Sequence, residues 1–174
     1  MKSFKQHIYE KLRVSSSTRT YTLFPKSKYE LKQMIENEIS KNGNECSLNH
    51  IDVSIISDMS KLFLGSAFNG DISGWDVSNV ETMFRMFYRS KFNGDISDWD
   101  ISNVKNMEDM FSNSKFNGDI SNWDVSTVEN MRYMFFNSEF NGDISNWDVS
   151  SVESMGYMFG YSPLEKNPPK WYKE

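Results

Sequence analysis

The chain has 174 residues, a net charge of −5 and one cysteine, Cys46, so an internal disulfide is excluded. No stretch reaches the ~20 consecutive apolar residues that a membrane span needs, and we expect no membrane partner. Residues 1–43 carry a net charge of +5 and residues 68–163 a net charge of −9, and because so acidic a body repels nucleic acid, we expect no direct nucleic-acid binding.

The pattern of residues 1–18 predicts an amphipathic leader helix followed by a flexible joint. Phe4, Ile8 and Leu12 recur every four residues and would share one helix face, while the Ser/Thr run at 15–18 is typical of a joint. This face can bind a groove of a partner or pack on the protein's own body, and the sequence leaves both open. The segment lacks the apolar run of a secretory signal. We therefore expect a cytoplasmic protein, or one carried in a virion if a phage encodes it.

Residues 19–43 are expected to form an N-terminal cap. The stretch YELKQMIENEISK at 29–41 predicts an amphipathic helix, and the Lys-Asn-Gly that follows is typical of a helix end. The apolar residues of this helix share one face, which would cover the first unit of the array that follows: Leu31, Met34, Ile35 and Ile39.

Residues 44–171 form an array of 24-residue repeats, each of which we call a coil. Four clear copies begin at Phe68, Phe92, Phe116 and Phe140 without insertions. A degenerate copy precedes them and a partial copy follows. A fixed period of this length predicts units that stack on one another, with atypical units at the ends. The coils are 44–67, 68–91, 92–115, 116–139, 140–163 and the partial 164–171.

Each coil reads as a tight turn, a short strand and a short helix. In the coil 68–91 the turn is Asn-Gly-Asp at 69–71, the strand is 72–77, and Ser78 with Glu81 resembles a capping box that opens a helix. We therefore expect an α/β fold, namely a right-handed leucine-rich-repeat-like solenoid of 24-residue coils, with a short parallel strand plus a short helix per coil and an N-terminal helical cap. Its core would be six columns of equivalent residues that begin at Phe68, Ile72, Trp75, Met83, Met86 and Phe87.

Two columns of carboxylates begin at Asp71 and Asp76. Their negative charges repel one another at the distance between stacked coils, so each carboxylate needs a cation or hydrogen-bond donors nearby. Either calcium binds between them or each carboxylate accepts hydrogen bonds from turn amides. Calcium-binding repeats supply several glycines per site, whereas each turn here has one glycine. We therefore favour hydrogen bonds and expect no metal and no cofactor.

No catalytic constellation is evident. The two histidines, His7 and His50, have no metal-ligand spacing, and neither a nucleophile elbow nor a phosphate-binding loop is present. Cys46 stands at a glycine position of the repeat, which favours an inert packed thiol. The sequence therefore predicts a protein without enzymatic activity.

The repeated FNGDISGWDVSNVETMFRMF resembles the Mycoplasma-type repeat domain of unknown function, often described as a BspA-like leucine-rich repeat surface protein. This resemblance implies a leucine-rich-repeat-like solenoid and a surface-exposed protein that binds host or partner proteins. The opening MKSFKQHIYEKL is similar to the short leaders of tailed-phage proteins, some of which direct proteins into the phage head.

We expect the functional residues at the positions that vary between repeats, because the constant residues are interpreted as those that form the core and the turns. Several variable positions hold aromatic residues or arginine, the types enriched at interface hot spots. We expect a non-enzymatic protein–protein interaction scaffold. The alternative is a phage-encoded inhibitor of a host nucleic-acid-binding or defence complex, or a virion-associated protein. The predicted partner-binding residues are Phe84, Arg85, Tyr88, Arg89, Tyr133, Phe136, Tyr157 and Tyr161.

Overall fold

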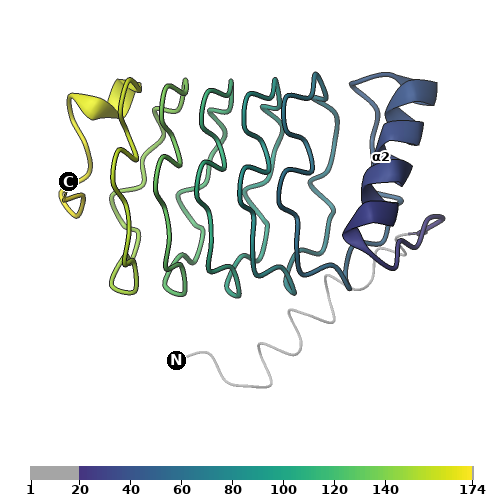
Figure 1. Ribbon diagram of the computed structural model, residues 1–174, viewed down its shortest axis with the longest axis horizontal. Helices are drawn as coiled ribbons and strands as arrows, with labels where there is room; N and C mark the ends of the chain where they lie inside the picture. The colour runs from purple at the N-terminus through teal and green to yellow at the C-terminus, as the bar shows by residue number, and fades with distance from the viewer. Residues whose placement is uncertain (1–19, 174) are drawn as a thin grey trace.

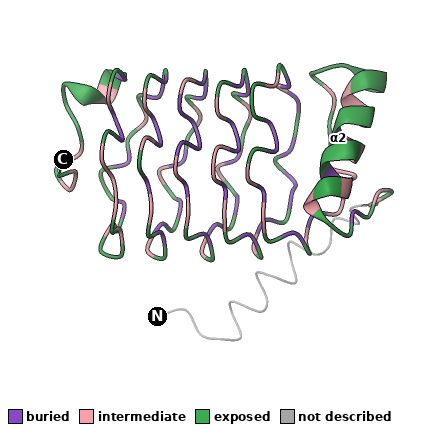
Figure 2. Ribbon diagram, in the orientation of Figure 1, coloured by how far each residue is buried: buried purple, intermediate pink, exposed green. Residues whose placement is uncertain are grey.

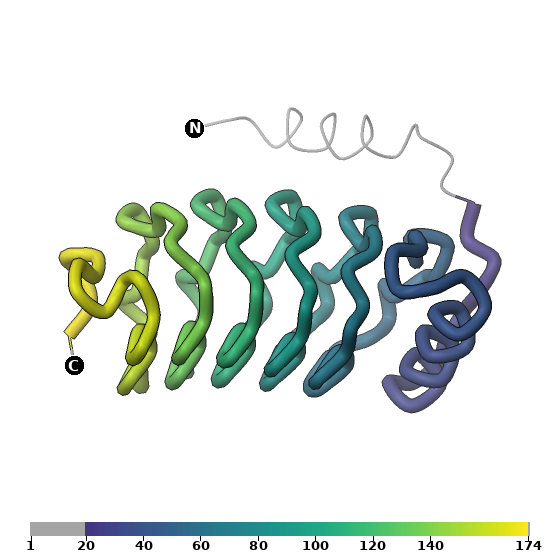
Figure 3. The backbone as a smooth tube through the Cα atoms, turned by 90° about the horizontal axis from the view of Figure 1, so that it is seen from above, coloured from purple at the N-terminus to yellow at the C-terminus, as the bar shows by residue number. Residues whose placement is uncertain are grey.

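The computed structural model describes residues 20–173, and in this part of the chain the coils lie side by side along one axis (Figure 1). The only regular elements there are one α-helix, α2 (Lys28–Asn42), and one short 3₁₀ helix, η1 (Pro163–Glu165). Helix α2 lies at one end of the stack and the C-terminus at the other, as the view from above also shows (Figure 3). The predicted leader and joint at 1–18 lie outside the described residues.

Helix α2 is present where the sequence predicted a helix, one residue longer at each end. Ser27 caps its start, because its hydroxyl accepts a hydrogen bond from the Glu30 N–H at 3.2 Å. Gly43 ends it with a φ of 83°, and its N–H donates to the Ile39 carbonyl at 2.8 Å. Leu31 and Ile35 are fully buried, so the apolar face of α2 is part of the core.

The expectation of an α/β, leucine-rich-repeat-like solenoid is wrong. Among the described residues no strand forms, and neighbouring coils share only one isolated parallel bridge each, such as Thr82 with Asn106. The predicted strand 72–77 is instead a tight turn, in which the Trp75 N–H donates to the Ile72 carbonyl at 3.1 Å. The description as a leucine-rich repeat therefore does not fit, and the structure is better called a stack of turn-built coils.

The helix predicted after Ser78 is also absent. The Ser78 hydroxyl donates to Asp76 at 2.6 Å instead of capping a helix, and the Val80 N–H bonds to the Val77 carbonyl in another tight turn. The Ser-Asn-Val-Glu sequence thus matches a capping box, but its serine hydroxyl is hydrogen-bonded to the aspartate two residues before it and does not cap a helix.

Residues 82–90 show why no helix follows. We call this stretch, with its equivalents 58–66, 106–114, 130–138 and 154–162, the turn segment of each coil. Some N–H groups of this segment bond to the next coil and others bond within the segment. Met83 and Arg85 donate to carbonyls of the next coil at 2.9 and 3.0 Å, whereas Met86 donates to the carbonyl three residues back at 3.0 Å. In an α-helix the backbone N–H groups bond to carbonyls of the same segment, but here about half of them donate to the next coil instead.

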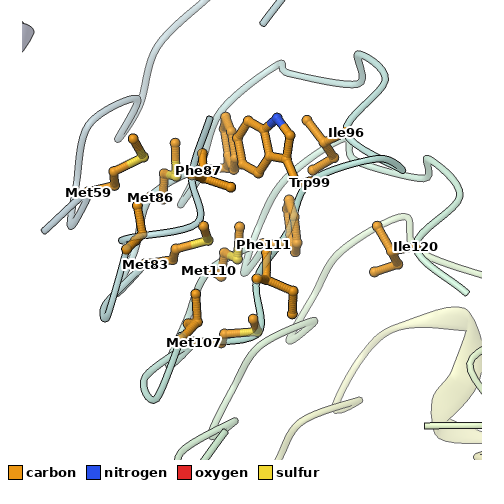
Figure 4. Packing of buried hydrophobic residues seen from close by; sticks show 14 of the residues in the cluster. Met59, Met83, Met86, Phe87, Ile96, Trp99, Met107, Met110, Phe111 and Ile120 are labelled. Atoms are coloured by element: carbon orange, nitrogen blue, oxygen red, sulfur yellow. The ribbon is translucent and has the colours of Figure 1, made fainter. Parts of the chain in front are cut away.

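The predicted core columns are confirmed. Every member is buried except Met155 in the last full coil, and buried residues recur at the same places from coil to coil (Figure 2). Rings of neighbouring coils stack in parallel, for example Phe87 with Phe111 at 5.6 Å and Trp75 with Trp99 at 6.4 Å between centroids. The labelled methionines gather beside the rings of Phe87, Trp99 and Phe111 (Figure 4).

Each tryptophan also joins two coils through its indole N–H. The Trp99 Nε1 donates to the Ile72 carbonyl of the preceding coil at 3.2 Å, and the same bond recurs at all five tryptophans, up to Trp171 with Ile144 at 2.9 Å. The indole therefore supplies both apolar area and a buried donor that is satisfied by the neighbouring coil.

The aspartate columns form hydrogen-bonded corners. The Asp95 Oδ1 accepts from the Ser97 N–H at 3.0 Å and from its hydroxyl at 2.8 Å, and these bonds, the backbone one first, hold the pKa of Asp95 below its usual value. The same serine N–H bond recurs at Asp119 and Asp143, whose pKa values are also lowered. Hydrogen bonds thus compensate these carboxylates, as the sequence favoured.

Candidate interaction surface

The eight predicted partner-binding residues all lie in turn segments, and the structure brings them together in two clusters. We call Phe84, Arg85, Tyr88 and Arg89, all from the coil 68–91, the arginine cluster. We call Tyr133, Phe136, Tyr157 and Tyr161, from the coils 116–139 and 140–163, the tyrosine cluster. The coil 92–115 lies between the two.

In the arginine cluster, cations lie over aromatic rings. The Arg85 guanidinium is 4.9 Å from the Phe84 ring centroid and 5.3 Å from that of Tyr88, and the Arg89 guanidinium is 5.1 Å from the Tyr88 centroid. The Arg85 Nε and Nη2 both donate to Asp109 Oδ2, at 2.9 and 2.8 Å. The Asp109 side chain is buried, so this ion pair orients the Arg85 side chain, which is still 41% exposed; Arg89 is exposed as well.

In the tyrosine cluster, four rings contact one another across two coils. Tyr133 and Tyr157 stack with centroids 5.6 Å apart and an angle of 9° between rings. Phe136 meets Tyr133 edge to face at 5.6 Å and Tyr161 at 5.3 Å. Tyr157 and Tyr161 are 55% and 74% exposed, so the cluster presents a continuous aromatic patch to solvent.

Five of the eight residues adopt the left-handed backbone conformation, which asparagine, aspartate and glycine tolerate better than arginine or tyrosine does. Their φ values are 55–58°, and the five residues are Arg85, Arg89, Tyr133, Tyr157 and Tyr161. For a residue with a Cβ this region costs roughly 1–2 kcal/mol, less for asparagine and aspartate. The same positions of other coils hold Asp109, Asn113 and Asn137, so tolerant residues do occur there. The arginines and tyrosines thus stand at these turns against the local backbone preference.

Two further cations border the clusters and were missed by the sequence reasoning. Lys61 of the first coil lies 5.3 Å from the Phe84 ring, and Arg132 lies 5.3 Å from the Tyr133 ring. Lys61 occupies the same turn position as Arg85 and Tyr133, with a φ of 61°. The signal that could have found it is the repeat period itself, since Lys61 is 24 residues before Arg85.

Other reactive groups in the described part of the chain form no recognisable centre. No three histidine, cysteine, aspartate or glutamate side chains between 20 and 173 gather as a metal site would require. Cys46 is half-buried, and burial raises the pKa of its thiol, which keeps it protonated. Helix α2 is too short and too polar to cross a membrane, and no other described segment is a candidate span.

Comparison with known proteins identifies a family but not an activity. No curated protein and no solved structure matches the chain. The family described as "Mycoplasma protein of unknown function, DUF285" matches residues 29–137 and again residues 91–172. The two matches overlap by about two coils, as expected for a repeat that can be aligned in more than one register. Because they span most of the sequence, the chain belongs to this family of Mycoplasma-type proteins of unknown function.

Proposed function

We propose that the protein is a binding module without catalytic activity, which recognises a protein partner through the arginine and tyrosine clusters. The observation that carries this proposal is the left-handed backbone at five of the eight residues. Backbone strain of this kind concentrates at functional sites, where a side chain is needed despite its local cost. A turn with only a structural role would be better served by asparagine or glycine.

The chemistry of the two clusters favours a partner with acidic and apolar groups. Arginine, tyrosine and other large aromatic side chains provide most of the binding energy in many interfaces. Here the rings already contact one another, so little side-chain freedom is lost on binding. Arg89 within the arginine cluster, Lys61 beside it and Arg132 beside the tyrosine cluster are cations that would attract carboxylates of the partner.

The test is a capture experiment in which the wild-type chain is compared with the double variant Tyr133→Ala/Phe136→Ala. These two side chains contact other surface rings, and neither is in the buried core. We expect the variant to stay folded and to lose the proteins that the wild type captures. A matched control is Asn122→Ala, because Asn122 is exposed and lies in neither cluster. If the double variant captures the same proteins with the same affinity, the assignment of this surface is wrong.

A second candidate function is inhibition of a host complex that binds nucleic acid or acts in defence, with the chain encoded by a phage or carried in its virion. The regular rows of carboxylates favour it, because Asp95, Asp119 and Asp143 are exposed and have lowered pKa values that keep them charged. Evenly spaced negative charges can imitate a phosphate backbone. Captured proteins that bind nucleic acid would support this function, and capsid proteins would support a virion role.

The site of action is part of the same proposal. A module of this kind would act in the cytoplasm or in a virion, whereas the resemblance to BspA-like proteins suggests the cell surface. Fractionation of the producing cells with an antibody to the full chain distinguishes these places.

A further inference from the structure

Five asparagines of the chain stand directly before a glycine, and in such a pair the side chain can react with the backbone. Glycine has no Cβ, so its nitrogen can come close to the Cγ of the asparagine before it. Four of the five pairs lie in the same hexapeptide, FNGDIS, once in each full coil. Because their sequence neighbours are identical, any difference in reactivity between them must come from the structure. These four asparagines are Asn69, Asn93, Asn117 and Asn141.

The reaction in question is deamidation through a cyclic imide. The glycine nitrogen attacks Cγ of the asparagine, a new C–N bond closes a succinimide ring, the glycine N–H proton is lost, and Nδ2 leaves as ammonia. Water then opens the ring at either of its two carbonyl carbons and gives aspartate or isoaspartate. A water molecule is consumed and an ammonia is released, so the reaction needs no oxidant and no other reactant.

The attacking nitrogen is in a similar position in all four coils. Within residues 20–173 no backbone carbonyl accepts a hydrogen bond from any of these glycine N–H groups. Each glycine also lies against the phenylalanine ring of its own coil, because an added Cβ would come within 2.9 Å of that ring. The nucleophile therefore does not distinguish the four pairs. The glycines are Gly70, Gly94, Gly118 and Gly142.

The carboxamides differ, because three of them are held by the coil that follows. The Asn93 N–H donates to Asn69 Oδ1 at 2.8 Å, and the Asn117 N–H donates to Asn93 Oδ1 at 2.7 Å. The Asn141 N–H donates to Asn117 Oδ1 at 2.8 Å. Ring closure turns the carboxamide toward the glycine nitrogen of its own coil and breaks this bond to the next coil. The bond therefore restrains the first three asparagines.

Asn141 lacks this restraint. One period later the chain has Glu165, but residues 163–165 form η1, and the Glu165 N–H donates to the Ser162 carbonyl at 3.1 Å. In the described part of the chain, the single hydrogen bond of Asn141 is the one that its own backbone N–H donates to Asn117. Asn141 is also exposed. Its carboxamide can therefore turn without breaking a hydrogen bond.

The fifth pair, Asn42 and Gly43, is blocked at the nucleophile instead. The Gly43 N–H donates to the Ile39 carbonyl at 2.8 Å at the end of α2. The Asn42 Nδ2 donates to Glu38 Oε2 at 3.1 Å. An attack by Gly43 would have to break both bonds, so we expect this pair to react slowly.

We propose that Asn141 is the site at which the folded protein deamidates, and that the coil following each earlier asparagine of the array protects it. The net contribution of a hydrogen bond corresponds to a rate difference of about fivefold, so Asn141 should react at least about fivefold faster than Asn117. Either product places a new carboxylate at position 141. Isoaspartate also leads the main chain through the former side chain and lengthens the backbone of the last full coil. This modification goes beyond the proposed binding of a partner.

The experiment is peptide mapping by mass spectrometry of the full chain after incubation in mildly alkaline buffer. Trypsin places the four asparagines in separate peptides, because Lys91, Lys105 and Arg132 lie between them. We expect the Asn141 peptide of the folded protein to gain the mass of deamidation first. In urea, where no coil protects another, the four peptides should react at equal rates. This comparison separates the effect of the structure from that of the sequence.

A variant in which residues 140–163 are duplicated directly after position 163 tests the protection itself. Asn141 is then followed, one period later, by an asparagine whose N–H can donate to its Oδ1. We expect Asn141 to become slow and the asparagine of the added copy to become the fast site. Asn141→Gln keeps the N–H that protects Asn117, so it is the control in which the fast reaction should disappear.

Three results would overturn the proposal. Equal rates at Asn117 and Asn141 in the folded wild type would show that the hydrogen bond gives no protection. Faster reaction at Asn117 would show that the N–H activates the carboxamide instead of restraining it. Persistent fast reaction at Asn141 in the duplicated variant would show that a following asparagine N–H does not decide the site. If that variant does not fold, the comparison of folded and urea-unfolded wild type still decides between the first two results and the proposal.

Discussion

Replacing Trp99 with phenylalanine tests whether the tryptophan column holds the coils together. Trp99 is 4% exposed, stacks on Trp75 with centroids 6.4 Å apart, and donates its Nε1–H to the Ile72 carbonyl at 3.2 Å. Phenylalanine keeps one ring in the column but has no donor. The Ile72 carbonyl keeps its bond from the Trp75 N–H, so it is not left without a partner.

The expected cost has two parts. Loss of a hydrogen bond within the protein costs about 1 kcal/mol. Loss of the second ring of the indole removes buried apolar area and leaves a cavity between coils, which adds about 1–3 kcal/mol, since neighbouring coils collapse only in part. We therefore expect Trp99→Phe to lower the free energy of unfolding by about 2–4 kcal/mol.

Trp171→Phe is the matched control, because Trp171 makes the same bond, at 2.9 Å to the Ile144 carbonyl, but is only half-buried at the end of the stack. There the cavity opens to solvent, so the cost should be about 1 kcal/mol. Urea unfolding followed by tryptophan fluorescence and by circular dichroism measures both. Equal costs for the two variants, or a cost for Trp99→Phe of under about 1 kcal/mol, would refute the reasoning.

Three further predictions follow from the turns and corners. Arg89→Asn should raise the free energy of unfolding by up to about 1 kcal/mol in urea titrations, since asparagine tolerates a φ of 57°, and should weaken partner capture. Asp95 accepts from Ser97, and its lowered folded pKa means that its contribution to stability is complete above the unfolded value and is lost as the pH falls through the folded one. The free energy of unfolding should therefore decrease below the ordinary carboxyl pKa of 3.8, and Asp95→Asn should make that decrease shallower in acid titrations followed by circular dichroism. Asp109→Asn should cost about 1 kcal/mol in urea unfolding, because Arg85 is 41% exposed and can turn to water, and it should release Arg85 from the Phe84 ring.

The core could be predicted from the sequence because it depends on recurrence alone. An apolar residue that returns every 24 positions must meet its own copy in the next coil, whatever backbone connects them. This is why Phe68, Trp75 and Phe87 were placed correctly without knowledge of the local conformation. The hydrogen-bonded aspartate corners followed from turn chemistry in the same way.

The backbone conformation could not be predicted by the same argument. Val80, Met83, Met86 and Phe87 have helical spacing, but that spacing also suits a segment of successive tight turns. The deciding fact is where the alternate N–H groups go, and this depends on the neighbouring coil. A clue was nevertheless present, because asparagine at 113 and 137 is typical of the left-handed conformation that breaks a helix.

The two clusters were partly foreseeable. Variation between repeats indicated residues outside the apolar core, and Tyr133 and Arg85 are indeed only partly buried, although Asp109 at the same position is buried. The ion pair of Arg85 with Asp109 could also have been found from the period, because the two residues are 24 apart and occupy the same position of neighbouring coils. The role of the two clusters in binding a partner stays a prediction.

The hydrogen bonds between neighbouring turn segments also imply that the gene could lose or gain whole 24-residue coils. Each coil bonds only to the coil before it and the coil after it, and every such bond spans about one period of sequence. Deleting residues 92–115 would therefore join two coils whose donors and acceptors already match. Duplicating the same 24 codons would add a coil with the same fit, so unequal recombination can lengthen or shorten this protein in whole coils without a new fold having to be selected.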